Sequence, residues 1–447
     1  MKSIRVKNFK SVADSEDFEL RPLTVLAGIN SSGKSTLLQS MLLLKQTLES
    51  GTLETLKTTG PYVVASEPID LARGKKRSNV ISISLSLDLD DVNPKEYVQY
   101  APIDNAVLEG IDIMIEVTTN GITVLNSISC VLKYSNTDKT ASILFKRKQK
   151  ANSLYTIKFS SPLMVGLDKS EKLRSMDDCK LTFHSFIPIF AEWERNGKAD
   201  TRAIAVTKSI EQDLMVYFTT LFYIGPQRIK PELAQGYSQT NFRDVGIDGQ
   251  YARFLYEANK SRPLQGYDGE TLQTVCNHWV CEKMGLARSM DVQRDVNKLY
   301  RTIITNEDGL SVDLCQMGFG LSQILPLMVQ GLLIYKGNTL IVEDPDVHMH
   351  PKVQALLVDF FIDMVKHGRR VVIETHSDHI VTRLRRRIAD GTIAKDEVNL
   401  TFVENGNEGS KYRFIDMESD GSFVNELPEG FLDVQENDFI EIISHRK

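Results

Sequence analysis

The chain lacks the features of a membrane protein or of a protein from an oxidising compartment. Its 447 residues contain no apolar run approaching 18 residues, and residues 1–4 open a strand rather than a signal peptide. Only five cysteines occur, an odd number at scattered positions, which suits a reducing compartment. Cys276, His278 and Cys281 have no fourth ligand nearby, so their spacing does not predict zinc. We expect a cytoplasmic protein without a membrane segment.

An excess of positive charge is also absent. The chain has 53 Lys and Arg against 59 Asp and Glu, a net charge of −6. This balance argues against a protein whose surface is covered with nucleic-acid-binding sites. Local basic clusters stand at residues 75–77, 146–150 and 383–387. Each could contact phosphates or form a solvated face, and both interpretations stay open. No sustained heptads occur, which excludes long coiled-coil arms.

A phosphate-binding pattern stands near the N-terminus. Residues 28–36 read GINSSGKST, which fits G-x-x-x-x-G-K-[ST]. Residues 23–27 predict a buried strand before this loop, and residues 37–48 predict a helix after it. Such a loop turns backbone N–H groups onto phosphates, with Lys34 on the β- and γ-phosphates and Ser35 on Mg²⁺. The expected ATP-binding residues of the loop are Gly28, Asn30, Ser31, Ser32, Gly33, Lys34, Ser35 and Thr36.

Two later strands are predicted to end in polar side chains. The apolar run of residues 338–342 leads into Glu343 and Asp344, and residues 369–377 lead through a second run to His376. Carboxylates just past a buried strand can hold Mg²⁺ and polarise an attacking water. An imidazole there can donate to the γ-phosphate. The predicted catalytic residues are Glu343, Asp344 and His376, with Glu343 also an Mg²⁺ ligand.

These segments together resemble the ABC-class ATPases of the SMC/RecF/OLD group. The resemblance is carried by MKSIRVKNFKS at the start, NSSGKST, GFGLSQILPL, EDPDVHMHP and ETHS, over roughly residues 1–75 and 220–447. LPEGF at residues 427–431 is similar to the close of RecF-like AAA proteins. The ATPase subunit of Septu-type antiphage systems belongs to this neighbourhood.

The resemblance implies a role for each matched position. Glu343 takes the Walker B place, Asp344 the place of the catalytic base and His376 that of the switch histidine, while Arg228 faces the nucleotide side. The signature position, which in this class touches the γ-phosphate held by a second head, is filled by Gly318, Gly320 and Ser322. Since the chain has one P-loop, the resemblance implies a homodimer or higher oligomer that sandwiches two ATP molecules.

Three departures from the class pattern affect the expected activity. The signature reads GFGLSQ rather than LSGGQ, and Asp344 is one methylene shorter than the usual Glu. No Gln occurs between Thr47 and Val98, where a Gln would bridge Mg²⁺ and water. Misplacement of a base by about an ångström can lower a rate strongly. Slow hydrolysis and nucleotide sensing both stay open.

Periodicity predicts an α/β fold, namely an ABC-type ATPase head with a mixed or parallel core sheet, an antiparallel β subdomain and a helical insertion. Strict alternation over residues 79–90, and similar runs at 111–117, 122–134, 142–146 and 155–159, predict the antiparallel strands. Residues 205–222 and 250–300 predict helices. The expected ranges are 1–185 and 301–424 for the two halves of the head, 186–300 for the insertion and 425–447 for a small C-terminal element.

Two functions remain open. The chain is either the ATPase subunit of a prokaryotic antiphage complex that controls a separate nuclease of HNH type, or a RecF-like ATPase that binds DNA in repair. A nuclease of its own, as in OLD proteins, would need an acidic metal-binding module, and too few residues follow His376 to form one.

Overall fold

The computed structural model describes residues 1–51, 54–88, 107–135, 137, 140–148, 154–160, 175–192, 201–237, 241–317, 319–428, 441 and 443–444. The chain forms two compact units. The first consists of residues 1–20, 35–220 and 405–411, and the second of residues 21–34, 221–404 and 412–447. Within the described ranges, no helix has both the length and the apolar character needed to span a bilayer.

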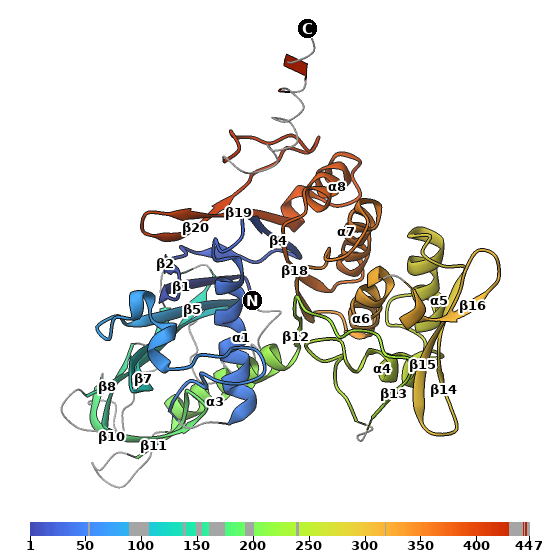
Figure 1. The fold of residues 1–447 in the computed structure, drawn as a ribbon. Helices are drawn as coiled ribbons and strands as arrows, with labels where there is room; N and C mark the ends of the chain where they lie inside the picture. The colour runs from blue at the N-terminus through green and yellow to red at the C-terminus, as the bar shows by residue number, and fades with distance from the viewer. Residues whose placement is uncertain are drawn as a thin grey trace. The chain divides into compact units, whose positions relative to one another are not determined.

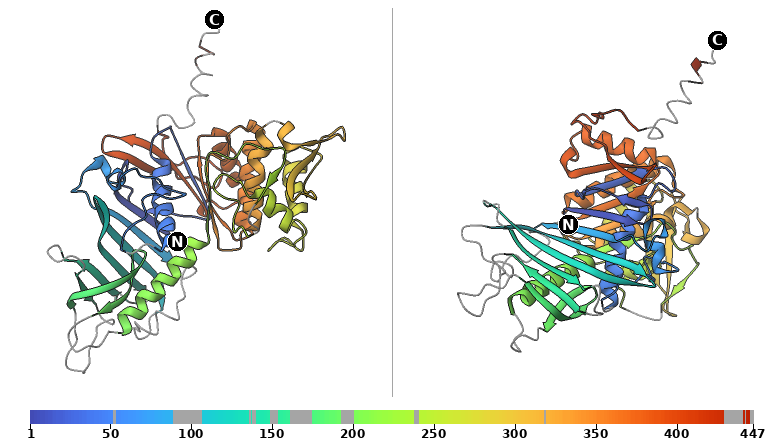
Figure 2. Two further views of the ribbon diagram at one scale, coloured as in Figure 1. Left: turned by 60° about the horizontal axis from the view of Figure 1, so that its bottom comes forward. Right: turned by 90° about the vertical axis from the view of Figure 1, so that its left-hand side faces the viewer.

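The first unit is built on a ten-stranded antiparallel sheet, whose long middle strands are visible in Figure 2. Its order is β11-β10-β9-β8-β7-β6-β5-β1-β2, and β3 pairs with β1. The strands are β1 (Ser3–Phe9), β2 (Val12–Asp14), β3 (Phe18–Glu19), β5 (Ile81–Asp88), β6 (Leu108–Asn120), β7 (Ile122–Tyr134), β8 (Thr140–Arg147), β9 (Leu154–Phe159), β10 (Ser175–His184) and β11 (Ile187–Glu192).

The alternating residues form this sheet as predicted. In β5, Ile83 and Leu85 are buried whereas Ser84 and Ser86 are half-buried, so one face is apolar and the other meets water. The last two residues of the predicted run 79–90 lie outside the described residues. Gly121 turns the β6–β7 hairpin at a φ of +76°, a conformation that favours glycine.

The first unit also contains two α-helices, α1 and α3, among its described residues. Helix α1 (Lys34–Ser50) follows the phosphate-binding loop, and α3 (Thr201–Thr219) packs on β11. The two helices meet where Lys45 Nζ donates to the Phe218 carbonyl at 2.8 Å. Two short 3-10 helices, η1 (Pro68–Leu71) and η2 (Arg73–Lys75), lie between α1 and β5. The helices predicted after the P-loop and from residue 205 are confirmed.

The second unit is built on a six-stranded sheet of order β12-β17-β18-β4-β19-β20 (Figure 1). The first five strands are parallel. Strand β20 follows β19 after two residues, a connection too short for a parallel crossover, so the sheet is mixed. The strands are β4 (Leu23–Gly28), β12 (Leu221–Ile224), β17 (Thr339–Glu343), β18 (Arg370–Thr375), β19 (Val398–Gly406) and β20 (Gly409–Phe414).

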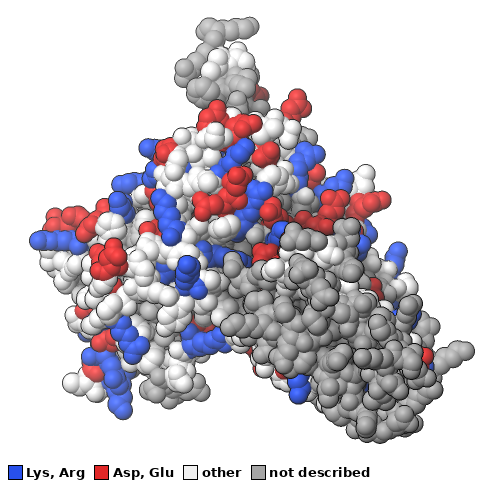
Figure 3. All heavy atoms as spheres, turned by 180° about the vertical axis from the view of Figure 1, so that it is seen from behind, with Lys and Arg blue, Asp and Glu red and all other residues white. Residues whose placement is uncertain are grey.

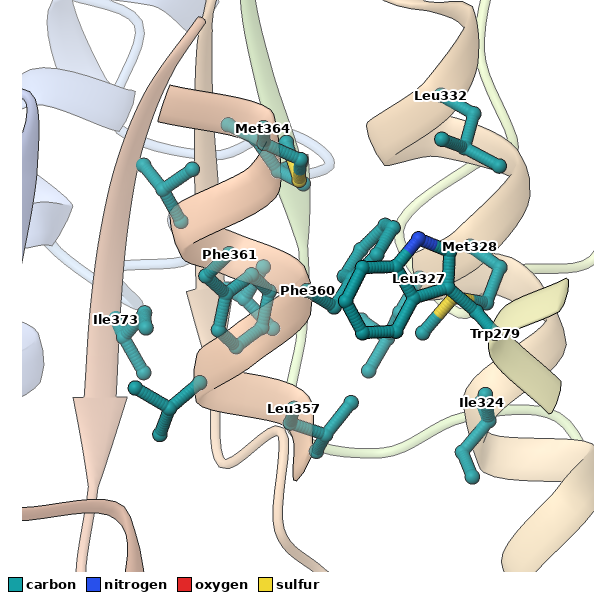
Figure 4. Packing of buried hydrophobic residues seen from close by; sticks show 14 of the residues in the cluster. Trp279, Ile324, Leu327, Met328, Leu332, Leu357, Phe360, Phe361, Met364 and Ile373 are labelled. Carbon is teal, nitrogen blue, oxygen red and sulfur yellow. The ribbon is translucent and has the colours of Figure 1, made fainter. Parts of the chain in front are cut away.

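Apolar helices pack with this sheet into the main hydrophobic core (Figure 4). Between α6 and α7, the ring of Trp279 meets Phe360 edge-on, with centroids 5.5 Å apart. Aromatic pairs of this geometry add stability beyond the area they bury. The helices of the unit are α4 (Ala252–Asn259), α5 (Leu272–Asn277), the π-helix η4 (His278–Lys283), the 3-10 helices η5 (Leu314–Gln316) and η6 (Lys395–Glu397), α6 (Phe319–Leu333), α7 (Pro351–Lys366) and α8 (Asp378–Ala389).

The expectation of helix throughout residues 250–300 is only partly right. A small antiparallel sheet follows η4, and Met290 and Val292 of its edge strand are buried at alternate positions, a spacing of two that suits a strand. The expected helix at 205–222 likewise ends early, because β12 begins at Leu221. The small sheet contains β13 (Gln235–Gly236), β14 (Ser289–Arg294), β15 (Leu299–Thr305) and β16 (Ser311–Asp313).

The predicted α/β fold class, with a core sheet and an antiparallel β subdomain, is confirmed. Strand β4 from the start of the chain lies between β18 and β19 from its end, so these parts share one sheet, as expected. The division at residues 185, 300 and 424 stays a prediction, and most of the range 425–447 lies outside the described residues.

Candidate functional site

Three strands of the core sheet bring the predicted residues to one edge. Because β4, β17 and β18 are parallel neighbours, their carboxyl ends meet at the same edge, which is where ligands bind in such sheets. The register places Glu343 of β17 opposite Glu374 of β18, and Thr375 of β18 opposite Ala27 of β4. The P-loop and the acids, which are about 300 residues apart in the sequence, therefore lie at the same edge of the sheet.

The loop after β4 has the backbone of a phosphate-binding turn. Gly28 and Gly33 adopt φ values of +148° and +102°, which favour glycine. A Cβ at Gly28 would lie 2.3 Å from the Val403 carbonyl oxygen of β19, so no larger residue fits there. Lys34 is 3% exposed, and its Nζ donates to the carbonyls of Gly28 and Ile29 at 2.9 and 2.8 Å. The lysine therefore reaches back over the loop.

The charge of Lys34 is balanced by acids of the neighbouring strands. Burial lowers the pKa of Lys34, and the negative charges of Glu374 and Asp344 oppose this shift. Elsewhere in the loop Asn30 and Ser31 are exposed, and the buried Ser32 hydroxyl has no hydrogen-bond partner among the described residues. A phosphate oxygen is an acceptor that such a hydroxyl could engage.

The last two residues of the pattern, Ser35 and Thr36, lie in the first turn of α1. The Thr36 hydroxyl lies 3.1 Å from that of Ser11, a contact within the first unit. Ser35 directly follows Lys34 in the chain. The assignments of Ser35 to Mg²⁺ and of Thr36 to the nucleotide stay predictions.

Glu343 is a buried acid at the end of β17. It is 7% exposed, and the Tyr223 hydroxyl of β12 donates to its Oε1 at 3.0 Å. Burial, together with the negative charge of Glu374, raises the pKa of Glu343 to about 8, although the Tyr223 hydrogen bond acts in the other direction. A divalent cation would favour the ionised form of this carboxyl. Mg²⁺ is usually held by one or two carboxylates plus phosphates, and this donor set fits it.

Asp344 turns the chain out of the sheet. Its φ of +45° is left-handed, a conformation that Asp tolerates better than most residues, and its N–H donates to the Glu374 carbonyl at 2.9 Å. Its buried Oδ1 has no hydrogen-bond partner in the described part of the chain. The lone pairs of this oxygen are therefore not engaged by the described protein groups, which is what a general base for a bound water would require.

The turn that carries His376 is fixed on both sides. Thr375 donates to Asp346 Oδ1 at 2.5 Å, and Ser377 donates to Gln354 Oε1 at 2.6 Å. His376 itself is exposed. Partial burial of the ring and the charge of Lys34 lower the pKa of His376, whereas the negative charges of Asp344 and Asp346 act in the opposite direction. The imidazole is thus neutral at physiological pH.

The signature segment opens helix α6. Gly318 lies outside the described residues. Gly320 is half-buried, and a Cβ there would lie 3.5 Å from the His348 carbonyl oxygen of the loop after β17. Ser322 is 6% exposed, and Pro326 one turn later cannot donate to its carbonyl. The signature role of these residues stays a prediction.

Three polar residues at this edge were not predicted from the sequence, and a fourth has contacts that the sequence did not specify. Glu374, Tyr223 and Asp346 had no predicted role, although Glu374 and Asp346 stand beside the predicted acids in the sequence. The expectation that Arg228 faces the nucleotide side stays a prediction, and its guanidinium donates to the backbone carbonyls of Glu343 and Asp344. Burial lowers the pKa of Arg228 to about 10.

The basic clusters are largely engaged within the protein. On α8, Arg383 and Arg387 both donate to the Asp359 carboxylate, and Arg385 donates to the Gly421 carbonyl and covers the Phe423 ring. Further ion pairs are Lys75–Asp70, Arg147–Glu54 and Lys148–Asp178. On the face shown in Figure 3, Lys and Arg are interspersed with Asp and Glu. These pairs weaken the interpretation of the clusters as a phosphate-binding surface.

A glycine-rich loop, an inward lysine and buried acids at the carboxyl edge of a parallel sheet define a nucleotide-phosphate site.

The chain matches the AAA ATPase domain family over residues 1–211 and 252–381. This is more than half of its length, and the chain belongs to that family. It is therefore an AAA ATPase. Among curated proteins, none matches the chain.

Solved structures similar to this chain include heads of SMC proteins. An SMC head bound to the C-terminal winged-helix domain of ScpA is 12% identical, with a TM-score of 0.47, covering 93% of this chain and 98% of the other. The SMC head domain from Thermotoga maritima is 12% identical, with a TM-score of 0.42, covering 93% and 99%. An SMC head with an extended coiled coil, bound to the C-terminal domain of ScpA derived from Pyrococcus furiosus, is 11% identical, with a TM-score of 0.44, covering 100% and 99%.

Proposed function

We propose that this chain hydrolyses ATP at the carboxyl edge of the β4–β17–β18 sheet. The observation that carries the proposal is the convergence there of Lys34, Glu343, Asp344 and His376. Lys34 binds the β- and γ-phosphates, since a charge-assisted hydrogen bond to phosphate is stronger than its present bonds to two carbonyls. Loss of ATP binding in Lys34→Ala would be the first support.

In this proposal the acids divide the work. Glu343 and Ser35, by the sequence pattern, are the protein ligands of Mg²⁺, which when bound neutralises developing phosphate charge. Asp344 takes the proton of the attacking water at its Oδ1. The neutral imidazole of His376 donates a hydrogen bond to the γ-phosphate, and it is neutral because its pKa is lowered. Hydrolysis is slow in this scheme, because the Asp344 side chain is one methylene shorter than the usual Glu.

The active form is proposed to be a homodimer or a higher oligomer closed by ATP. Each chain carries one P-loop and one signature segment, so a complete site needs the Gly318–Ser322 region of a second copy. The motif resemblance further suggests a prokaryotic antiphage complex in which the ATPase controls a separate HNH-type nuclease. The internal pairing of the basic residues on α8 favours this over direct DNA binding by a RecF-like repair ATPase.

The adjacent reading frame offers the decisive experiment. If it encodes an HNH nuclease, the two products should purify together, and ATP should change DNA cleavage by the pair. The same complex carrying Lys34→Ala is the control, and its cleavage should not respond to ATP. Tight ATP-dependent binding of DNA ends by the chain alone, with no nuclease partner, would support the repair function and contradict this proposal.

A further inference from the structure

The turn that carries the two acids is held from the neighbouring strand β12. Arg228, four residues after this strand, is only 8% exposed. Its Nη1 donates to the Asp344 carbonyl at 3.0 Å, and its Nη2 donates to the Glu343 carbonyl at 2.9 Å. The two outer nitrogens of one guanidinium thus bind two consecutive peptide groups.

This turn requires such support because its backbone is unusual. At Asp344 the chain leaves the β17 ladder with a φ of +45°, a conformation that costs a residue other than glycine roughly 1 kcal/mol. The Asp344 N–H is bound to the Glu374 carbonyl, so the turn is held from β18 as well. Without Arg228 the Glu343 and Asp344 carbonyls would lose these buried donors, and buried carbonyls without donors are rare in native proteins.

The same strand also holds the side chain of the first acid. Tyr223 lies opposite Ile341 in the β12–β17 register, and its hydroxyl donates to Glu343 Oε1 at 3.0 Å. Tyr223 and Arg228 are five residues apart. One short segment therefore fixes both the carboxyl group of Glu343 and the peptide groups on which the Asp344 carboxylate depends.

A buried arginine is a costly way to satisfy two carbonyls. Its Nε is buried with no hydrogen-bond partner among the described residues, and its Nη1 and Nη2 donate to peptide oxygens rather than to carboxylates. Burial lowers the pKa of Arg228 even though the negative charges of Asp344 and Asp346 favour its charged form, so burying this cation is costly and stability alone gives little reason for an arginine there. What the guanidinium supplies is a planar fork that fixes two acceptors at once.

We propose that Arg228 is a positioning residue of the ATPase centre, which sets the place of the Asp344 carboxylate by holding the Glu343 and Asp344 carbonyls. Tyr223 assists by fixing the Glu343 side chain. This inference rests on the proposed ATP hydrolysis. It differs from the expectation that Arg228 faces the nucleotide, since a nucleotide ligand would govern ATP affinity and a positioning residue governs turnover.

The test compares Arg228→Met with a matched control. Arg253 is equally buried at 6%, and its guanidinium donates to the Glu232 and Tyr300 carbonyls at 2.8 and 3.4 Å, away from the acid turn. Arg253→Met therefore removes a similar buried cation. We expect Arg228→Met to lower kcat about 100-fold, the effect of a base misplaced by about an ångström, with ATP affinity within about threefold of the parent. Arg253→Met should leave kcat within about threefold.

Several results would overturn the inference. Equal kcat values for Arg228→Met and Arg253→Met would show that the effect is one of stability alone. ATP affinity that falls in proportion to kcat would make Arg228 a nucleotide ligand. If Arg228→Met does not fold, Tyr223→Phe replaces it, with Tyr256→Phe as control because the Tyr256 hydroxyl donates to the Met290 carbonyl. A several-fold lower kcat at unchanged affinity in Tyr223→Phe alone is then expected, and its absence would contradict the proposal.

The parent protein separates this inference from the proposed function. If the parent does not release phosphate from ATP, both fail. If the parent hydrolyses ATP, Lys34→Ala does not, and Arg228→Met behaves as Arg253→Met does, only the positioning role fails.

Discussion

Replacing Asp344 by Asn tests the chemistry of the acid turn with little disturbance of its structure. Asn has nearly the same shape and tolerates a left-handed backbone, so the φ of +45° should be retained. The hydrogen bonds to Arg228 and Glu374 use backbone atoms of residue 344, and the substitution leaves both in place. Only a negative charge and one carboxylate acceptor are lost.

The expected changes differ greatly in size between activity and stability. A positioned general base typically contributes 10²- to 10⁴-fold, or about 3 to 5 kcal/mol of barrier at 1.36 kcal/mol per factor of ten. The free energy of unfolding should change by less than about 1 kcal/mol, as at sites without broken contacts. Glu343 is largely protonated at neutral pH, and repulsion of the Asp344 charge from Asp346 opposes its attraction to Lys34, so removal of this charge is nearly neutral for stability.

Asp344→Glu is the complementary change, since it restores the usual side-chain length. The longer side chain brings a carboxylate about an ångström closer to the water, so the rate should equal or exceed that of the parent. Glu is less suited than Asp to a left-handed backbone, and a stability loss of about 1 kcal/mol is expected. Higher activity combined with lower stability would identify side-chain reach as the limiting factor.

Steady-state phosphate release measures the rates, calorimetry the ATP affinity and denaturant unfolding the stability. Glu343→Gln is included because, if Asp344 only supports Glu343 and is not the base, a loss of activity is expected for Glu343→Gln alone. A parent-like rate for Asp344→Asn would refute the base assignment. It would then favour a protein that holds ATP as a sensor over one that cycles it.

Three further predictions concern the nucleotide loop, the signature helix and the α7–α8 contact. Lys34→Ala should weaken Mg-ATP binding at least tenfold in calorimetry, because the phosphates lose their ammonium partner; unchanged affinity would disprove the P-loop assignment. Ser322→Arg should abolish hydrolysis and ATP-dependent self-association in light scattering while one chain still binds ATP, and full activity would mean that the signature is misplaced. Asp359→Asn should lower the free energy of unfolding by about 2 kcal/mol at pH 7, since Arg383 and Arg387 lose their shared carboxylate. Burial would raise the pKa of Asp359, but the two arginines lower it below its usual value, so the deficit is complete above about pH 4 and shrinks as the pH falls through the folded pKa. Denaturant unfolding at several pH values measures this, and a deficit that does not depend on pH would refute it.

The antiparallel sheet is predictable from sequence because its information is local. Where a strand has one apolar and one wet face, alternation gives its type, and β7 runs from Ile122 to Tyr134 as predicted. The bounds are less certain, since β6 extends beyond the predicted run 111–117, and β10 and β11 were not predicted. Strand β14 was not predicted, because its two buried residues, Met290 and Val292, are too few to establish a period of two beside η4. Short strands that pack under helices have weak patterns of their own.

The candidate site is predictable only where one segment contains the whole signal. Lys34, Glu343 and His376 stand in motifs whose spacing is fixed by a single loop. Glu374 and Tyr223 become neighbours of Glu343 only through the order β12-β17-β18, which no local pattern specifies. The backbone clamp by Arg228 likewise depends on a left-handed turn that periodicity does not reveal.

The charges at the edge of the sheet connect nucleotide binding with the stability of the site. Glu343, Glu374 and Asp344 lie close enough to influence one another, and Lys34 is the cation that interacts with two of them. Burial together with Glu374 raises the pKa of Glu343 to about 8, so at neutral pH this acid is held largely in its protonated form. Mg-ATP would favour its ionised form and draw Lys34 towards phosphate, and each change alters the charge that Asp344 experiences. Because Arg228 and Tyr223 keep the acids in place while these charges change, the β12 segment is the part of the site that does not need to move.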